Sequence, residues 1–376
     1  MAAQSAGNRH GRGGSGRRPT IHDVARSAAV SPATVSNVLT GRRPVDPELA
    51  RRVLSSVDAL GYSRDFAASA LRSVQRTVVG AIVPELANPF FASLVDRLER
   101  EARVAGRRLV VTTSGGDPAE EARQVAALTA WRPAGVIAVP CDGGFAAREL
   151  LEQEGIPFVV VDRPLDDGVK VDTVAVDNVA AARTGARKLL RLGHRALLVV
   201  ASSTTLGNIR ERVAGIDAAI ADVGGGACAE LLEAGFELGP IARAVGTRLR
   251  RQPQPTAVFA LNNVLTLGTL KAAAARGLAI PDDFSLLGFD DYDWMEVFRP
   301  PLSAVRQPVA ELAHAAWRRL AALTGAGPMQ AVPVPCHIRL PCRLAWRGSV
   351  AMPPGVRTGR PLEAGGAAAM AERSRS

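Results

Sequence analysis

Two patterns of apolar positions divide this chain of 376 residues. From Thr77 to about Arg347, short runs of Val, Ile, Leu and Ala alternate with amphipathic stretches of helical length. Continuous apolar runs of this kind predict parallel strands that are buried on both faces, and the stretches between them predict crossover helices. Two doubly wound parallel sheets fit the length of this region better than one sheet. The runs include VVGAIV, RLVVTT, GVIAVP, PFVVVD, ALLVVA, AVFAL and FSLLGFD.

The segment that precedes these runs has a different pattern, which predicts three short helices. Thr20 can cap the first helix, and Asp23 stands three residues later, as in a capping box. Ser31 can cap a second helix, Asp46 can cap a third, and Gly61 can end it. Two short helices joined by a tight turn and braced by a third form a helix-turn-helix, whose second helix enters the major groove of DNA. A generic three-helix bundle is the alternative that the spacing leaves open.

The net charge of +10 is concentrated at the two ends of the chain. Residues 1–76 contain 12 arginines against 5 acidic residues, residues 347–376 contain 5 arginines against 2 acidic residues, and the 270 residues between them are neutral. A basic N-terminal module on a neutral body is typical of a phosphate-binding head attached to a sensing domain. From charge alone, an arginine-rich tail that is only solvated is an equal alternative.

Composition narrows the class of protein further. The hydrophobic fraction of 47% is sufficient for a sizeable core, but no run of 18 apolar residues and no signal-peptide pattern occurs. We therefore expect a cytoplasmic protein with no membrane partner. The four cysteines lack the spacing of metal ligands or of a disulfide framework, and we expect them to be reduced and buried. Because no phosphate-loop or nucleophile motif is found, we expect no cofactor, no metal or catalytic residues, and no enzyme.

Polar and aromatic residues follow several of the predicted strands. Because ligands of doubly wound sheets bind at the carboxyl ends of the strands, these side chains are expected to lie close together. Carboxylates, amides and arginines bind vicinal hydroxyls, and flat aromatic rings cover the C–H faces of a sugar. Taken singly, each residue could equally belong to a turn, the core or a surface ion pair. The candidate effector-binding residues are Asn88, Phe90, Phe91, Asp162, Arg163, Arg212, Asn262, Asp290 and Gln307.

The N-terminal helices carry a specific resemblance. The sequence TIHDVARSAAVSPATVSNVLTGRRPV resembles the helix-turn-helix head of the LacI/GalR (lactose-repressor) family, which implies a transcription regulator that binds double-stranded DNA. Ala29 stands where the family usually has glycine in the turn, and Asn37 stands where arginine or histidine often reads a base. Asn37 can bond adenine bidentately, so we expect a different operator preference. The residues of the head expected to contact DNA are Thr20, Ser31, Pro32, Ala33, Thr34, Ser36 and Asn37.

The segment RDFAASALRS follows the head and resembles the hinge helix of the same family. By itself it is too short to be a stable helix in water. The resemblance implies that it orders on DNA and pairs with the hinge helix of a second chain, so that a homodimer binds a palindromic operator. It also implies that Leu71 inserts into the minor groove, with Ala68 as a further DNA contact. A leucine that only docks on the body is the alternative.

The region from Thr77 onward resembles the periplasmic-binding-protein-like body of LacI/GalR regulators. The matching segments include VDN, GHR, RVAG, GFDD and PPLSAVRQP. The nine candidate effector-binding residues match the ligand-contact pattern of ribose-binding proteins with this fold, which implies a ribose-like monosaccharide as effector. Family members also bind hexoses, nucleosides and purines. One departure is Asn263, because aspartate usually follows the asparagine at position 262.

We therefore predict a transcription regulator, a repressor, whose operator affinity is controlled by a small sugar-like effector. A body that responds to a partner protein, or to a nucleoside or purine, is the alternative; a sugar-binding transport protein would have an export signal and no DNA-binding head. The predicted divisions are a disordered basic arm (1–18), the head (19–63), the hinge helix and linker (64–76), an effector-binding and dimerisation domain (77–348) and a disordered tail (349–376). Within the body, the predicted subdomains are about 77–176 plus 304–334, and about 177–303 plus 335–348.

Overall fold

The computed structural model describes residues 19–40, 44–62, 77–166, 168–325 and 334–354. These residues belong to two separate units, residues 1–74 and residues 75–376. The predicted arm at 1–18, the hinge segment with Ala68 and Leu71, and the tail from residue 355 onward lie outside the described residues. The structure therefore bears on the head and on the body, and the hinge helix stays a prediction.

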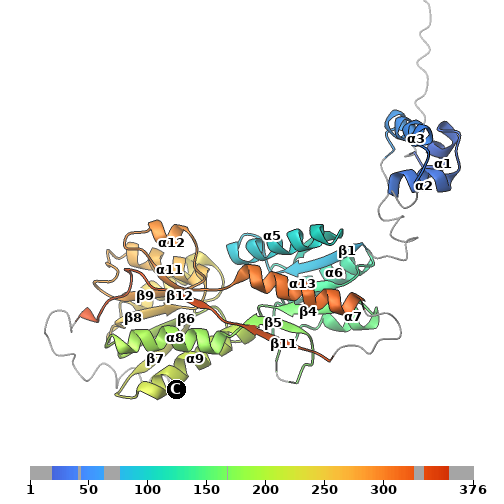
Figure 1. Cartoon of the computed structure of the whole chain (residues 1–376). Coiled ribbons are helices and arrows are strands. Elements are labelled where there is room, and N and C mark those ends of the chain that lie inside the picture. The colour runs from blue at the N-terminus through green and yellow to red at the C-terminus, as the bar shows by residue number, and fades with distance from the viewer. Residues whose placement is uncertain (1–18, 41–43, 63–76, 167, 326–333, 355–376) are drawn as a thin grey trace, which may run out of the picture. The chain divides into compact units, whose positions relative to one another are not determined.

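In its described part, the first unit has the three predicted helices: α1 (Ile21–Ser27), α2 (Pro32–Thr40) and α3 (Pro47–Leu60) (Figure 1). At the start of α1, Thr20 Oγ1 accepts a hydrogen bond from the Asp23 backbone N–H, and the Asp23 carboxylate accepts one from the Thr20 N–H at 2.9 Å. The capping box is thus confirmed. Asp46 caps α3, and Gly61 follows it with a left-handed φ of 59°. The buried apolar side chains are Val24, Ala25, Ala28, Val35 and Val53.

The turn between α1 and α2 contains an alanine in a left-handed conformation, since the φ of Ala29 is 52°. Alanine costs roughly 1 kcal/mol there relative to glycine, because its Cβ crowds the backbone. We therefore expect Ala29→Gly to stabilise the head by about 1 kcal/mol, measured by amide hydrogen exchange of α1 to α3 in the full chain. The control is Ala33→Gly: Ala33 is also exposed but lies within α2, where glycine is expected to destabilise by about 1 kcal/mol. Equal effects of the two substitutions would contradict this account of the turn.

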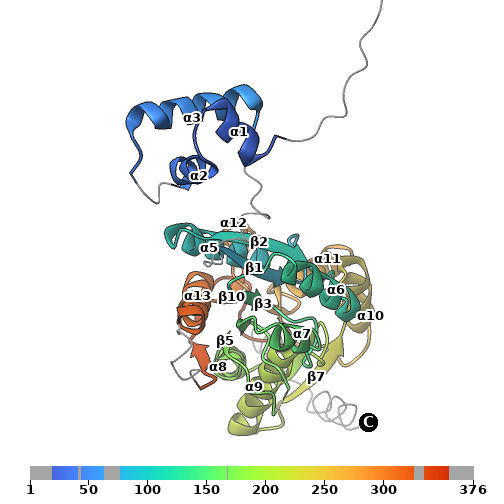
Figure 2. The same cartoon turned by 90° about the vertical axis from the view of Figure 1, so that its right-hand side faces the viewer.

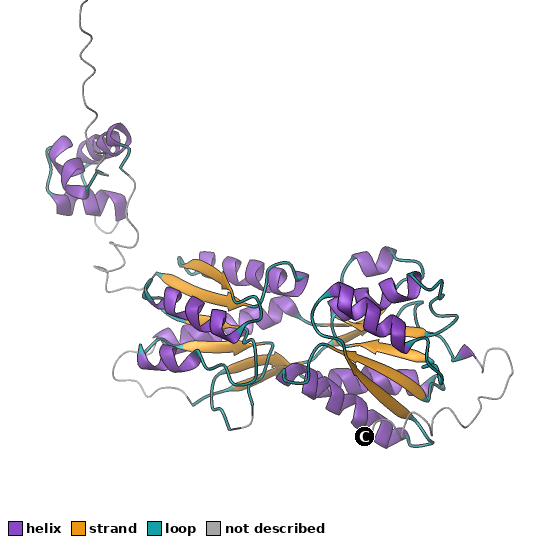
Figure 3. Ribbon diagram, turned by 180° about the vertical axis from the view of Figure 1, so that it is seen from behind, coloured by secondary structure: helices purple, strands orange, loops and turns teal. Residues whose placement is uncertain are grey.

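Two parallel sheets form the framework of the second unit in its described residues (Figure 3). The strands of the first sheet are β1 (Val78–Val83), β2 (Arg108–Thr113), β3 (Val136–Ala138), β4 (Phe158–Val161), β5 (Thr173–Val176) and β11 (His337–Leu340). Those of the second sheet are β6 (Ala196–Ala201), β7 (Cys228–Glu233), β8 (Ala257–Ala260), β9 (Ser285–Phe289), β10 (Ser303–Arg306) and β12 (Arg343–Ala345). The strand orders are β11-β5-β4-β3-β1-β2 and β12-β10-β9-β8-β6-β7. The paired strands are parallel except β12, which runs antiparallel to β10, so the predicted doubly wound fold is confirmed.

Each sheet and its helices form one subdomain. The helices of the first subdomain are α5 (Pro89–Val104), α6 (Pro118–Thr129), α7 (Arg148–Gln153) and α13 (Val309–Gly325). The helices of the second subdomain are α8 (Asn178–Arg191), α9 (Gly207–Val223), α10 (Leu238–Arg248), α11 (Asn263–Ala274) and α12 (Trp294–Val297). In the first subdomain, α5 and α13 lie side by side and bury one apolar face of the sheet, while α6 and α7 bury the other (Figure 2). Burial on both faces explains why these strands are continuously apolar.

The chain crosses between the subdomains after β5, at the predicted division, and after β10 and β11, each a few residues beyond the predicted division. Residues 303–305 pair with β9 in the second sheet, and residues 337–340 pair with β5 in the first sheet. Pro308 and Pro341 stand at these crossings, where a residue without an N–H cannot continue a strand ladder. The body also extends past the predicted end at 348, since the Leu286 N–H donates to the Ser349 carbonyl at 2.8 Å.

Candidate functional site

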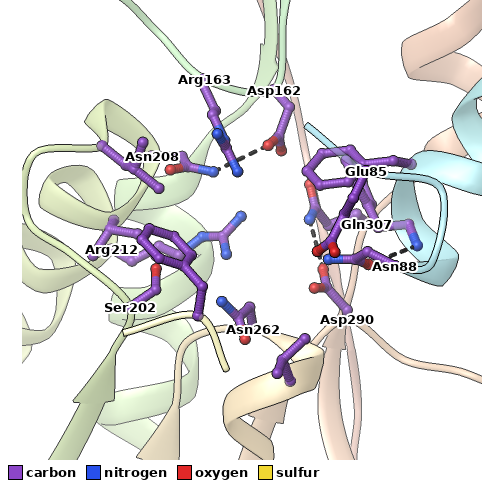
Figure 4. A pocket seen from close by; sticks show the side chains of 16 residues that line it. Glu85, Asn88, Asp162, Arg163, Ser202, Asn208, Arg212, Asn262, Asp290 and Gln307 are labelled. Atoms are coloured by element: carbon purple, nitrogen blue, oxygen red, sulfur yellow. Dashed lines mark hydrogen bonds between the residues drawn. The ribbon is translucent and has the colours of Figure 1, made fainter. Parts of the chain in front are cut away.

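A cavity lies between the two subdomains, at the carboxyl ends of strands from both sheets (Figure 4). The structure brings together around it all nine residues that the sequence suggested as effector-binding, and the labelled polar side chains point toward a common space. The first subdomain contributes Asn88, Phe90, Phe91, Asp162 and Arg163. The second contributes Arg212, Asn262 and Asp290, and Gln307 comes from the crossing after β10. Parallel-strand geometry alone accounts for this convergence.

Seven further residues line the cavity and were not predicted: Glu85, Ser202, Leu206, Asn208, Ile209, Phe236 and Val264. Ser202 directly follows β6, so the strand-end argument could have found it. Asn208 lies four residues before Arg212 on α9, and residues four apart share a helix face. Phe236 lies in a glycine-rich loop whose sequence shows no periodic pattern, and 59% of its surface is exposed. The sequence held no signal for that residue.

Asp162 and Asp290 occupy equivalent places in the two subdomains. Each directly follows a buried strand, and each has a positive φ, 67° for Asp162 and 73° for Asp290. Aspartate tolerates this region better than most residues, and backbone strain of this kind clusters at ligand sites. Asp162 Oδ2 accepts a hydrogen bond from Asn208 Nδ2 at 3.1 Å, and Asp290 Oδ1 accepts one from Gln307 Nε2 at 2.6 Å. The two carboxylates are thereby fixed in orientation.

Arg212 is the most deeply buried charged residue of the cavity, with 2% of its surface exposed. Its Nε donates to Asn178 Oδ1 at 2.9 Å and its Nη1 donates to the Leu261 carbonyl at 2.6 Å. The guanidinium also stacks 3.5 Å from the centre of the Phe289 ring. These contacts hold the group rigidly and leave Nη2 without a hydrogen-bond partner among the described residues. A planar donor fixed in this way is suited to bind a ligand oxygen.

Several buried polar atoms on residues that line the cavity, Arg212 Nη2 among them, lack a hydrogen-bond partner within the described residues. They include both acceptors and donors: Asp162 Oδ1, Asn208 Oδ1, Gln307 Oε1, Arg163 Nε and Arg212 Nη2. A buried polar group that remains unpaired costs about 1–3 kcal/mol. A small ligand that both donates and accepts hydrogen bonds in several directions would satisfy this set.

Burial changes the protonation of both carboxylates. It raises the pKa of Asp162 to about 6, although the positive charges of Arg212 and Arg163 oppose the rise. It also raises the pKa of Asp290, again against the charge of Arg212 and against the hydrogen bond from Gln307. Both groups therefore take up a proton at a higher pH than ordinary aspartates do.

Aromatic rings supply the apolar part of the cavity. Phe90 and Phe91 lie in the first turn of α5 and meet edge to face, with 5.4 Å between ring centres. Asn88 caps this helix by accepting a hydrogen bond from the Phe90 N–H at 3.0 Å, so the cap that starts α5 also places both rings. Together with Phe236, these rings offer flat surfaces to the C–H groups of a ligand.

Other kinds of site find no support in the part of the chain that the structure describes. There, no group of three His, Cys, Asp or Glu side chains is arranged to hold a metal ion. Within the same ranges, no helix is both long and apolar enough to cross a membrane. Cys141 and Cys228 are buried, as expected, whereas Cys336 and Cys342 are only partly buried.

In the head, six of the seven predicted DNA contacts lie on or just before α2, and the seventh, Thr20, caps α1. Ser31, Pro32 and Ala33 are exposed, and Thr20, Thr34, Ser36 and Asn37 are partly exposed, whereas Val35 on the opposite side is buried. Ser31 Oγ accepts a hydrogen bond from the Thr34 N–H at 3.1 Å and thus caps α2. This arrangement leaves the N-terminal end of α2 available to a DNA groove.

Both units are similar to parts of known proteins. Residues 20–65 match the bacterial regulatory proteins of the lacI family, and residues 186–350 match the periplasmic binding protein-like domain. The HTH-type transcriptional regulator GntR of Pseudomonas aeruginosa is 31% identical over 314 residues, which cover 81% of this chain and 89% of that protein. A LacI family transcriptional regulator from Enterococcus faecium, solved with bound ribose, is 26% identical with a TM-score of 0.64 and covers 73% of this chain and 99% of that one. The complex of the transcriptional regulator CelR with cellobiose is 26% identical with a TM-score of 0.66 and covers 89% of this chain and all of that one.

The fold and the two sites define a DNA-binding transcription regulator that responds to a small-molecule effector, and not an enzyme. The chain belongs to the LacI family, with a helix-turn-helix head and a periplasmic-binding-protein-like effector domain. The family resemblance of the sequence is thereby confirmed. Operator DNA and a small-molecule effector are its partners.

Proposed function

We propose that this regulator is a repressor whose effector is a monosaccharide of ribose-like size, bound in the cavity between the subdomains. The observation that carries the proposal is the set of unpartnered buried donors and acceptors on residues that line one cavity. Vicinal hydroxyl groups both donate and accept, so a small polyol can pair with carboxylate, amide and guanidinium atoms at once. The nine residues predicted from the sequence, from Asn88 to Gln307, which are among those that line the cavity, are proposed as its effector-binding residues.

The cavity has room for a small ligand. Its empty space, part of which opens to solvent, is about 550 Å³, within the range of small-molecule sites.

The charges of the cavity favour a neutral ligand. Asp162, Asp290 and Glu85 line it together with Arg163 and Arg212, so the acidic groups at least balance the basic ones. A phosphate group would need a net positive site to offset its desolvation. A neutral sugar meets both kinds of group through hydrogen bonds and brings no charge into a buried space.

On the DNA side, we propose that a homodimer places two heads on a palindromic operator. The residues from Thr20 to Asn37 named above would contact each half-site, and Leu71 and Ala68 of the hinge segment would contact the minor groove between them. Effector binding would change the relative position of the two subdomains, and thereby how well the paired hinges fit DNA. The family match of residues 20–65 supports this arrangement.

Calorimetric titration of the full chain with a panel of ligands tests the effector. The panel contains D-ribose, other pentoses, hexoses, cellobiose, nucleosides and purines. We expect a pentose or hexose to bind at least about tenfold more tightly than cellobiose or any purine. Tighter binding of a purine or a nucleoside, or binding of none of the panel, would overturn the proposal, and the latter outcome would favour a protein partner.

Effector binding is expected to weaken in acid. A hydroxyl that donates to Asp162 requires the ionised carboxylate, and the pKa of this group is about 6 in the protein. Since bound ligand stabilises the ionised form, affinity is full above the pKa and falls by up to about tenfold for each pH unit below it. Calorimetry at pH 7.5 and pH 5 should therefore show at least a fivefold weaker binding at pH 5.

The control for this pH dependence is Asp162→Asn, which has no titrating carboxylate at the position. This variant should bind the effector more weakly at pH 7.5. Its affinity should then depend on pH only through Asp290, because burial raises the pKa of Asp290 too. An unchanged slope in the variant would show that Asp162 does not accept a hydrogen bond from the ligand.

A further inference from the structure

Asn263, the first residue of α11, joins the two subdomains by its side chain. Its Nδ2 donates to Asn88 Oδ1 at 2.8 Å and to Tyr292 Oη at 3.0 Å, and its backbone N–H donates to Asp290 Oδ2 at 3.3 Å. Asn88 belongs to the first subdomain, whereas Tyr292 and Asp290 belong to the second. Only 6% of the surface of Asn263 is exposed. Both hydrogens of its amide are therefore used, one of them for the contact between subdomains.

The orientation of the Asn88 amide determines which hydrogen-bonding group residue 263 must provide. Asn88 Oδ1 also accepts the hydrogen bond from the Phe90 N–H that caps α5. A reversed amide would place its NH₂ group against that N–H, so the oxygen must remain where it is. The partner of this oxygen has to be a donor. An amide at position 263 meets the requirement, and an ionised carboxylate does not.

The other polar contacts between the facing sides of the subdomains involve α9. Asn208 donates to Asp162, and Arg210 pairs with Asp166. Among the side-chain hydrogen bonds of the described residues, the Asn263 contact is thus the one that ties α5 to the second subdomain. Because Phe90 and Phe91 lie in the first turn of α5, this contact also fixes one wall of the cavity.

We propose that Asn263 is a positioning residue that holds the first turn of α5 against the second subdomain, and that its amide is required for the cavity to close around the effector. The inference rests on the proposed effector site and adds a residue that does not line it. An aspartate at this position would bring another carboxylate beside Asp290 and would set an acceptor against Asn88 Oδ1.

A matched pair of variants tests the requirement for a donor. In Asn263→Asp the new carboxylate cannot donate to Asn88, although an acid in the first turn of α11 suits the helix dipole and should allow folding. In Asn88→Asp the position still offers an oxygen to both the Phe90 N–H and Asn263 Nδ2, so the contact should persist. The two variants add the same charge, and only the first removes the donor.

The first measurement is amide hydrogen exchange of the full chain without effector, at neutral pH. In Asn263→Asp we expect exchange in residues 86–92, which belong to the other subdomain, to be about tenfold faster than in the wild type. In Asn88→Asp we expect exchange in that segment to stay within about twofold of the wild type. A role of Asn263 confined to α11 would not alter this segment. Wild-type exchange in Asn263→Asp, or equally fast exchange in both variants, would overturn the proposal.

The second measurement is calorimetry with D-ribose. Asn263→Asp should bind it on the order of tenfold more weakly than the wild type, because part of the binding energy must then close the cavity. Unchanged affinity would overturn the requirement for the amide. If the wild type binds no sugar while the exchange difference is present, the proposed effector fails and the role of Asn263 in joining the subdomains stands.

Discussion

Raising the monovalent salt concentration from about 50 to about 200 mM is expected to weaken operator binding by about 1,000-fold or more. The basic charge of the chain is concentrated at its ends: residues 1–76 have 12 arginines and 5 acidic residues, while the central 270 residues are neutral. Two such heads on one operator would contact some 6–10 phosphates, and each contact releases counterions. The logarithm of the association constant should therefore fall linearly with the logarithm of the salt concentration, as measured by fluorescence anisotropy of a labelled operator.

The effector site provides the control for this salt dependence. The cavity is buried and its proposed ligand is neutral, so the affinity for D-ribose should change by less than about twofold over the same range. The logarithm of the operator association constant could also fall less steeply with the logarithm of the salt concentration than about three phosphate contacts require. That result would contradict the proposal that the basic head contacts the DNA backbone. Equal salt dependence of the two binding events would contradict their assignment to two separate units.

Arg212→Ala is expected to lower the affinity for the effector by at least about 100-fold. Arg212 offers an unpartnered, buried Nη2 to the cavity and is held by Asn178, the Leu261 carbonyl and the Phe289 ring. Hydrogen bonds to a charged group contribute about 1.5–3 kcal/mol each, and two such bonds to a sugar correspond to about 100-fold or more. The loss also removes the positive charge that stabilises the ionised forms of Asp162 and Asp290. Calorimetry with the best ligand of the panel measures the effect.

Arg248→Ala is the matched control, because it separates a loss of binding from a loss of stability. Arg248 is also a buried arginine of the second subdomain, but it pairs with Glu230 and does not line the cavity. We expect Arg248→Ala to lower the unfolding temperature and to leave the affinity for the effector within about twofold. If both variants reduce affinity equally, Arg212 acts on the fold and does not bind the effector.

The sequence predicted best what local chemistry determines. A capping residue bonds to backbone groups only two or three positions away, so its effect can be predicted from the local sequence. As predicted, α1 begins after Thr20, and α3 begins after Asp46 and ends before the left-handed Gly61. The strands ALLVVA and SLLGF are buried on both faces, and such burial requires a largely continuous apolar run in the sequence. The ends of such strands determine where Asp162 and Asp290 lie, and therefore where most of the cavity lies.

Features that depend on contacts between distant segments could not be predicted from the local sequence. The strand β11 lies at the edge of its sheet, where alternate residues are exposed, so its short sequence HIRL has no continuous apolar run and its sheet was misassigned. Phe236 lines the cavity from a loop without periodicity. The role proposed for Asn263 depends on Asn88, which lies 175 positions earlier in the chain. The hinge residues Ala68 and Leu71 lie outside the described residues and stay predictions.

The central claim is that a sugar in the cavity of the body controls how tightly the head binds a specific DNA site. The most direct test is an anisotropy titration of the full chain, at fixed salt, with an operator selected from a random duplex pool, with and without saturating D-ribose. We expect at least about 1,000-fold tighter binding to the selected site than to random duplex, and at least a fivefold change of that affinity with D-ribose in the wild type but not in Arg212→Ala. Equal affinity for selected and random duplex, with and without every sugar of the panel, would contradict the account.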